Sequence, residues 1–405
     1  MIRGARQLLT LRGPNSPRRG PALGELGVIQ DGSILIRDGH VVEVGATRRV
    51  ENLAEARKAF EINAAGRVVM PGFVDSHTHL VFPPSGTSGL DTAAAARDIR
   101  STTAQRIERR TRGFLEAMAR HGATTVEVKT GCGPDPRAEL KLLRVLSDIE
   151  RAPIDVVPTF LFRMTAPADS QDPSWAFSDL MPTLRRRHLA AFADVAWETG
   201  AEYRPTLLRC LEVARELGFP RKVHADQPGP APAIRAAIES LAATIDHIEW
   251  ATAAEAIQLA GSSAMAILLP YASFQTGGPG APARALIDAG VPVALASNFN
   301  PLFAPTFNMQ TVVALACLRM RMTPAEAISA ATINGAHAVG RGHRTGSLEP
   351  GKLADILILD ASDYQEVARR FGANLVHLTI KRGDIIYREG AVAGSRPAIP
   401  LSRRD

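Results

Sequence analysis

The feature that most constrains the fold of this 405-residue chain is an alternation of strand-like and helix-like segments through its middle. Short apolar runs are followed by helix-like stretches, such as DPRAELKLLRVLSDIE after the second run and TLLRCLEVARELG after the fourth. The expected strands lie near residues 72–80, 123–130, 154–162, 194–198, 221–226, 243–249, 265–270 and 291–298. Eight such units in about 270 residues match an α/β fold of the (β/α)₈ (TIM) barrel type. A doubly wound open sheet is disfavoured because no GxGxxG loop follows the first strand.

Both ends of the chain show a different pattern, in which short β-rich runs alternate with turn signals. Asp31-Gly32 and Asp38-Gly39, within GVIQDGSILIRDGHVVEVGA, are typical of hairpin turns. ADILILD and LVHLTIKRGDIIYREG near the C-terminus also indicate short antiparallel strands. Because each end has too few strands to be stable alone, we expect both to form one small β-sandwich. The expected domains are residues 1–68 and 346–405 for the β-sandwich and residues 69–345 for the barrel.

Composition and charge disfavour several classes of protein. A net charge of +6 arises from 47 basic and 41 acidic residues without a long basic run, and 5% of the residues are aromatic. This composition disfavours a nucleic-acid-binding module. Three widely separated cysteines indicate neither a disulfide framework nor a CxxC site. No apolar run is long enough to cross a bilayer or to form a signal-peptide core. We therefore expect a cytoplasmic protein with a small-molecule substrate and no nucleic-acid or membrane partner.

Four of the ten histidines are expected at one end of the barrel. His77 and His79 lie two residues apart at the end of the first strand, so both imidazoles point to the same face. His224 ends the fifth strand and His247 ends the sixth, and barrel active sites form at the C-terminal ends of the strands. Because neutral imidazole is a common ligand of Zn²⁺ and iron, this pattern favours a metal site over isolated structural histidines. We interpret the remaining six as structural or surface residues: His40, His121, His188, His337, His343 and His377.

These motifs resemble the metal-dependent amidohydrolase superfamily and, within it, the imidazolonepropionase family, whose members open the imidazolone ring in histidine breakdown. The matching segments run in order from Met70 to Asp360. They are PGFVDSHTHLVF, GATTVEVKTG, KVHADQ, DHIE, ALASNFNP, MTPAEAISAATINGAHAVG and GSLEPGKLADILILD. The last segment recurs across the superfamily, whereas HADQ, DHIE and FNP are more specific to the imidazolonepropionase-like members.

The resemblance implies a cofactor and roles for individual residues. One Zn²⁺ or Fe²⁺/Fe³⁺ ion per chain would be held by His77, His79 and His224. Gln227 would hydrogen-bond the activated water or the substrate, and His247 would orient or polarise the substrate carbonyl. The family usually forms homodimers, so the resemblance also implies a homodimer.

The sequence departs from the family at the end of strand eight, where the family has an aspartate that contacts the metal and takes a proton from the activated water. Asn298 stands there. Its amide oxygen can bind a metal, so Asn298 stays a candidate ligand and catalytic residue. An amide has no useful basicity, however, and general-base catalysis is typically worth about 10²–10⁴-fold. At strand four, Glu198 replaces a lysine that could be carboxylated and bridge two metals, which implies a mononuclear site.

The expected substrate shell also differs from the family. Gly86 falls where an arginine that pairs with a substrate carboxylate is expected, and Leu302 and Phe303 replace small residues. Arg163 is a possible substitute cation. The candidate substrate contacts are Cys132 in place of a tyrosine, Met164 in place of a histidine, and Asn300.

Two functions therefore remain open from the sequence. The first is a mononuclear metal hydrolase that cleaves a non-peptide C–N bond of a cyclic amide with a metal-activated water. The second is a catalytically impaired protein of the same fold that binds a ligand without turnover, because Asn298 replaces the base. Cys132 also has two interpretations, a thiolate near the metal or a small residue filling the space of the tyrosine. The absence of a histidine nearby in sequence favours the second.

Overall fold

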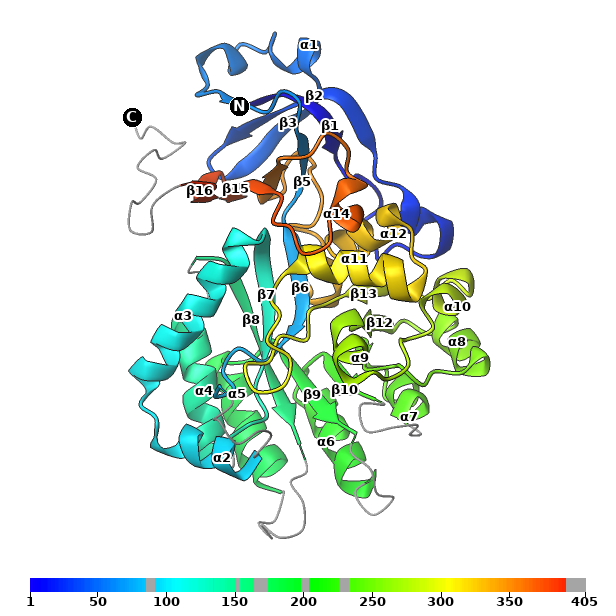
Figure 1. Ribbon diagram of the computed structural model, residues 1–405. Coiled ribbons are helices and arrows are strands. Elements are labelled where there is room, and N and C mark those ends of the chain that lie inside the picture. Colours follow the sequence, from blue (N-terminus) through cyan, green and yellow to red (C-terminus); the bar gives the residue numbers. More distant parts are fainter. Residues whose placement is uncertain are drawn as a thin grey trace.

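The central part of the chain forms a parallel (β/α)₈ barrel in the computed structural model (Figure 1). The structure describes residues 1–84, 92–133, 135–149, 153–163, 174–197, 204–225 and 233–390. Eight strands follow one another in chain order around the sheet, and each overlaps one of the expected segments. They are β6 (Phe73–Thr78), β7 (Ala123–Lys129), β8 (Asp155–Phe162), β9 (Phe192–Ala196), β10 (Arg221–His224), β11 (Thr244–Asp246), β12 (Met265–Leu268) and β13 (Val293–Leu295). The expected barrel is confirmed.

The first and last barrel strands meet just beyond their C-terminal ends. Thr78 forms a parallel bridge with Phe299. The amide of His79 donates to the carbonyl of Phe299 at 2.7 Å, and the amide of Asn298 donates to the carbonyl of His77 at 3.1 Å. These hydrogen bonds fix the backbone of both histidines because they lie on the seam that closes the barrel.

Helices surround the barrel strands, and their sequences explain where they begin. Thr252 and Glu255 form a capping box at the start of α8, and Thr323 and Glu326 form another at the start of α12. The helices from α2 to α8 are α2 (Thr92–Ser101), α3 (Ala104–Arg120), α4 (Pro136–Asp148), the π-helix η3 (Ala176–Leu180), α5 (Met181–Arg187), α6 (Arg204–Glu216), α7 (Ala233–Glu239) and α8 (Ala253–Ala260). The later ones are α9 (Pro270–Thr276), α10 (Ala283–Asp288), α11 (Met309–Met320), α12 (Pro324–Ala330) and α13 (Ile333–Ala338).

Both chain ends contribute to a second, mixed sheet that lies beside the barrel (Figure 1). Its path is β16-β15-β14-β5-β1-β2-β3, with β4 also paired to β1. The strands are β1 (Ile2–Leu9), β2 (Val28–Arg37), β3 (His40–Ala46), β4 (Ile62–Asn63), β5 (Val68–Pro71), β14 (Ile356–Leu359), β15 (Val376–Lys381) and β16 (Asp384–Arg388). The short helices are η1 (Gly20–Gly24), α1 (Thr47–Val50), η2 (Ala56–Lys58) and α14 (Glu366–Arg369). The small β domain built from both chain ends is confirmed.

β5 joins the two halves of this sheet. It pairs parallel with β1 and antiparallel with β14, so the sheet is not wholly antiparallel as the sequence indicated. Because β5 begins at Val68, the last residues before the barrel also belong to the sheet. The division of the chain at residues 68 and 346 stays a prediction.

One of the two expected hairpin turns is wrong. Asp38-Gly39 connects β2 to β3 with both φ angles positive, as a two-residue hairpin requires. Asp31-Gly32 instead lies inside β2, where Gly32 pairs with Ala5 on one side and Ala46 on the other. A Cβ on Gly32 would lie 2.6 Å from the Leu8 Cβ, so the glycine is needed for close packing between strands.

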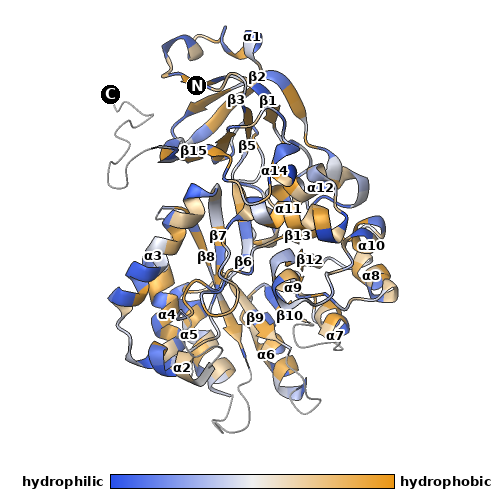
Figure 2. Cartoon of the chain, in the orientation of Figure 1, coloured by the Kyte–Doolittle hydropathy of each residue, from blue (hydrophilic) through white to orange (hydrophobic). Residues whose placement is uncertain are grey.

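Hydrophobic residues fill the interior of both domains. Figure 2 shows hydrophobic colouring along barrel strands such as β8 and β9, and hydrophilic stretches on the outer helix α3. The buried residues of α3 include Ile107, Thr111, Leu115 and Met118, whose spacing places them on one helical face. Among the described residues, no helix is both long and apolar enough to span a membrane.

Candidate metal centre

His77 and His79 lie together at the C-terminal end of the first barrel strand. Every residue of β6 is buried, and neither histidine is more than 2% exposed. The Nε2 atoms of the two rings are 3.2 Å apart. Two ring nitrogens at this separation are close enough to be ligands of one ion.

His224 and His247 complete the cluster from the fifth and sixth barrel strands. The ring centroid of His224 lies 4.6 Å from that of His77 and 5.9 Å from that of His79. The ring centroid of His247 lies 5.4 Å from those of both His77 and His224. One ring nitrogen from each of His77, His79 and His224 lies within 4.8 Å of the others. The structure thus brings the three expected ligands together and places His247 beside them.

Buried carboxylates contact two of these imidazoles at their Nδ1 atoms. Nδ1 of His77 lies 2.8 Å from Oδ2 of Asp246, and Nδ1 of His224 lies 3.0 Å from Oδ2 of Asp194. The His77 contact is a hydrogen bond, and a histidine that donates its Nδ1 proton to a carboxylate keeps a lone pair on Nε2, which is the usual arrangement of a metal ligand. Both ring nitrogens of His224 and Nδ1 of His79 are buried and have no hydrogen-bond partner among the described residues, so Nδ1 of His224 approaches Asp194 closely without an aligned hydrogen bond. A buried polar atom of this kind needs a partner, and a metal ion fits that need.

The imidazoles of the three expected ligands are neutral. Burial lowers the pKa of His77 well below its ordinary value, and the positive charge of Lys129 lowers it further although Asp246 opposes both. Burial likewise lowers the pKa of His79 well below its usual range and that of His224 to about 4. Neutral imidazole is the form that binds metal ions, so this set of donors is suited to one.

Two buried lysines neutralise most of the carboxylate charge below the histidines. Lys129 Nζ lies 2.5 Å from Asp194 and 2.9 Å from Asp246, and Lys222 Nζ lies 2.9 Å from Glu127. Burial alone would lower the pKa of Lys129, but the surrounding carboxylates raise it above its ordinary value. Two ammonium groups therefore face three carboxylates beside the imidazoles. The sequence interpretation missed this ionic cluster.

The strand-eight residues lie at the barrel seam next to His77. Asn298 is 7% exposed and has a φ of 55°, and its backbone amide bonds the carbonyl of His77. The neighbouring Ser297 donates its hydroxyl and its amide to the carboxylate of Asp75 at 2.5 and 3.0 Å. Burial raises the pKa of Asp75 to about 7. The side-chain oxygen of Asn300 accepts a hydrogen bond from the Leu302 amide. This oxygen therefore stabilises the local turn. The roles of Asn298 and Asn300 toward a metal or substrate stay predictions.

Cys132 follows β7 and contacts an apolar cluster that includes Leu142 and Phe299. Burial raises the pKa of its thiol well above the ordinary value, so the thiol is protonated. This environment agrees with the interpretation of Cys132 as a small space-filling residue rather than a thiolate. Four further positions singled out from the sequence lie outside the described residues: Gly86, Met164, Glu198 and Gln227.

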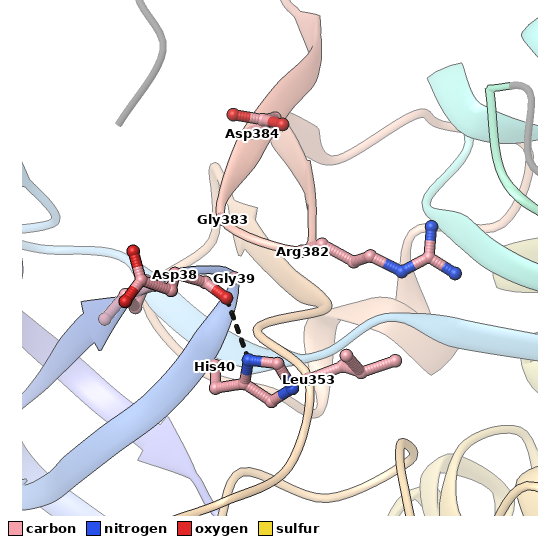
Figure 3. Close-up of a pocket in the computed structure, with 8 residues that line it drawn as sticks. Asp38, Gly39, His40, Leu353, Arg382, Gly383 and Asp384 are labelled. Carbon is pink, nitrogen blue, oxygen red and sulfur yellow. Dashed lines mark hydrogen bonds between the residues drawn. The ribbon is translucent and has the colours of Figure 1, made fainter. Parts of the chain in front are cut away.

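A separate pocket lies on the small sheet, where the β2–β3 turn meets the β15–β16 turn (Figure 3). Nδ1 of His40 is 2.8 Å from the Asp38 carbonyl, and the Arg382 side chain extends away from His40 toward its ion-pair partner Asp155. Residues of the turns line this pocket together with Leu353, and none of them belongs to the histidine cluster. It is therefore distinct from the candidate metal centre.

A model of the amidohydrolase family matches residues 68–386, which is most of the chain. This chain belongs to the amidohydrolase family. An imidazolonepropionase from Geobacillus kaustophilus (strain HTA426) is 37% identical over 420 residues, covering 96% of this chain and 98% of that protein. An imidazolonepropionase from Chloroflexus aggregans is 38% identical over 419 residues, covering 95% and 98%.

Solved structures of other proteins share the fold of this amidohydrolase. Escherichia coli guanine deaminase has a TM-score of 0.74 at 18% identity, covering 96% of this chain and 98% of that chain. Atrazine chlorohydrolase TrzN from Arthrobacter aurescens TC1, crystallised with zinc, has a TM-score of 0.74 at 16% identity, covering 96% and 95%. At these identities the likeness concerns the fold alone.

Proposed function

We propose that this amidohydrolase hydrolyses a non-peptide C–N bond of a cyclic amide with a metal-activated water. The observation that carries the proposal is the set of three buried, neutral histidines at the C-terminal ends of barrel strands, where active sites of this fold form. Similarity to imidazolonepropionases over nearly the whole chain supports a cyclic amide as the substrate class.

The donor set supports one Zn²⁺ or Fe²⁺/Fe³⁺ ion per chain, held by His77, His79 and His224. The unpartnered Nε2 of His224, buried beside the imidazoles of His77 and His79, favours a cation at this place. A bound ion of this type lowers the pKa of a water molecule and polarises a carbonyl. Asn298 is a candidate fourth ligand through its amide oxygen.

The residues around the histidines have separate proposed roles. His247 orients or polarises the substrate carbonyl, and Gln227 hydrogen-bonds the water or the substrate. Because the amide of Asn298 is not basic, another group must accept the proton of the attacking water. The ring of His247 lies 5.4 Å from those of both His77 and His224, and its Nδ1 lies 3.4 Å from a carboxylate oxygen of Glu249, a placement that suits the orienting role.

Turnover by the metal-loaded protein tests this proposal. The substrates are imidazolones, including imidazolonepropionate, with hydantoins, lactams and open-chain acyl amino acids. We expect ring opening of at least one cyclic amide and its loss when a chelator removes the metal. Bound metal without turnover of any substrate would favour the alternative, a protein of this fold that binds a ligand but is catalytically impaired.

Imidazolonepropionate itself is expected to be a poor substrate. Gly86 falls where the family's carboxylate-binding arginine is expected, and loss of a charged hydrogen bond costs about 1.5–3 kcal/mol. Turnover of this compound within the usual enzyme range of about 1–10³ s⁻¹ would contradict the inference.

We also propose a homodimer in the cytoplasm. The dimer is inferred from the family resemblance. The compartment is inferred from the three cysteines, each of which is a free thiol and suits a reducing environment. Sedimentation of the purified protein tests the first of these, and fractionation of the source cells tests the second.

A further inference from the structure

Below the histidine cluster, Lys129 connects carboxylates from the barrel interior. Its Nζ lies 2.5 Å from Oδ2 of Asp194, 2.9 Å from Oδ2 of Asp246 and 3.5 Å from Oε2 of Glu127. All four side chains are fully buried. Lys129 belongs to the second barrel strand, Asp194 to the fourth and Asp246 to the sixth. Side chains from alternate strands fill one layer of a barrel, so the ammonium belongs to a single interior layer with both aspartates.

The two aspartates that contact Lys129 are the same two that contact the expected metal ligands. Oδ2 of Asp246 lies 2.9 Å from Lys129 Nζ and 2.8 Å from His77 Nδ1. Oδ2 of Asp194 lies 2.5 Å from Lys129 Nζ and 3.0 Å from His224 Nδ1. Each of these oxygens therefore joins the ammonium to one imidazole.

A second group of possible metal ligands includes both of these aspartates. Asp194, His224 and Asp246 offer three ligand atoms within 4.8 Å of one another. The ammonium of Lys129, however, already contacts both carboxylates of this group. A second metal ion at this place would lie against a fixed positive charge, which opposes its binding.

We propose that Lys129 is a positioning residue whose ammonium fixes two carboxylates, so that they orient the imidazoles of His77 and His224 toward one ion. The same ammonium takes the place of a second cation and keeps the centre mononuclear. The inference rests on the proposed function, because it requires that the histidines bind a metal. Lys129 acts through the aspartates and touches none of the four clustered histidines in the described contacts.

Lys222 provides a matched control within the same ionic cluster. It is also fully buried and also contacts Glu127, at 2.9 Å, and it donates to the carbonyl of Ala338 at 3.0 Å. In the described contacts it does not reach either aspartate. Lys222 acts on Asp246 through charge at a distance, so removing its charge disturbs the buried cluster while the contacts of the two aspartates with Lys129 and the imidazoles remain.

The experiment compares Lys129→Met with Lys222→Met in the full-length protein. Each variant is loaded with Zn²⁺ or Co²⁺, its metal dissociation constant is measured by competition with a chelator, and the visible absorption of the Co²⁺ form reports ligand geometry. We expect Lys129→Met to weaken metal binding about 10–100-fold, the usual effect of losing an outer partner of a metal ligand, and Lys222→Met to change it less than about threefold. The Co²⁺ spectrum should change in Lys129→Met alone.

Equal metal affinity in Lys129→Met and wild type, or equal losses in the two variants, would overturn the inference. Lys129→Gln covers the case in which Lys129→Met does not fold, because its amide still donates a hydrogen bond to one aspartate. It should weaken metal binding, and the loss in Lys129→Gln combined with Asp194→Asn should be smaller than the product of the two single losses. If the loss of metal affinity in the double variant equals the product of the two single losses, Lys129 does not act through Asp194.

The wild-type measurement separates the two proposals. Tight metal binding by wild type with unchanged binding by the Lys129 variants would reject this inference and leave the proposed function standing. Absence of metal binding by correctly folded wild type would reject both.

Discussion

The two sheets of the molecule differ in what they bury. The core of the small sheet is mainly apolar, with residues such as Val69, Ile34 and Ile356 from both ends of the chain, and its buried ion pair, Lys381 with Asp355, stands apart from the histidines. The barrel sheet instead buries a connected group of carboxylates and ammonium groups inside the barrel, next to the imidazoles at the C-terminal ends of its strands. The small sheet therefore resembles an ordinary protein core, whereas the end of the barrel does not.

This difference indicates what each region does for the protein. Replacing buried ion pairs by apolar residues of similar volume is often neutral or stabilising, so the ionic layer of the barrel is poorly explained by stability alone. Its contacts with His77 and His224 explain it as support for a metal site. Changes in the small sheet should then alter stability with little effect on metal affinity. Changes in the histidine cluster should alter metal affinity with little effect on stability.

The largest effect is expected from removing the C-terminal half of the small sheet. Deletion of the residues after Gly346 removes β14, β15 and β16 and exposes the edge of β5, which pairs with β14 along its full length. The N-terminal strands should lose stable structure, because a few strands alone are marginal in water. Hydrogen exchange measures this directly. Unchanged amide protection in β1 and β2 would mean that the two chain ends do not depend on each other.

The next largest effect is expected at the histidines. His77→Ala or His224→Ala should weaken metal binding by at least about 100-fold, since loss of an outer partner alone typically costs about 10–100-fold. Chelator competition measures the affinity, and thermal unfolding of the metal-free forms checks that the fold is intact. His377→Ala is the control, because this histidine lies on the small sheet beside Glu389. A variant of either cluster histidine that keeps wild-type affinity would remove that residue from the ligand set.

A smaller effect, on stability alone, is expected from Ile356→Val in β14. Ile356 is fully buried in the core of the small sheet, and loss of one methylene from such a site costs about 0.5–1.5 kcal/mol. The free energy of unfolding should fall by this amount while the metal dissociation constant stays the same. If the free energy of metal binding changes as much as the free energy of unfolding, the small sheet and the metal site are not independent.

An effect of similar size, on metal affinity instead of stability, is expected from Asn298→Asp at the barrel seam. A carboxylate near the cation adds about 1 kcal/mol or more of attraction, so metal affinity should rise about five- to tenfold. Single-turnover hydrolysis should change little, because Cys132, Met164 and Phe303 are expected to differ from the family's substrate-binding residues and residues that act together do not contribute additively. Unchanged metal affinity would mean that the side chain of residue 298 does not face the metal.

The sequence predicted the barrel and the meeting of four histidines because strand ends converge in this fold. It also predicted the joint small domain, since neither chain end has enough strands to be stable. It did not predict that Gly32 lies inside a strand. An Asp-Gly pair usually indicates a turn, and the sequence does not show that the Leu8 side chain packs against Gly32.

The ionic layer could not be predicted for a different reason. Lys129, Asp194 and Asp246 lie on three strands that are far apart in sequence, and each looks like an ordinary charged residue at the edge of an apolar run. Only the register of the closed barrel shows that they share one layer. The available signal was that all three stand within strands expected to be buried on both faces, where an unpaired charge is costly.

The central claim is that one metal ion is held by His77, His79 and His224. X-ray absorption spectroscopy of the purified, metal-loaded protein, combined with elemental analysis, tests it most directly. The account predicts one ion per chain, with imidazole nitrogens at about 2.0–2.1 Å if the metal is zinc, and loss of this imidazole signal in His77→Ala. Folded protein that binds no transition metal, or that binds two ions per chain, would contradict it.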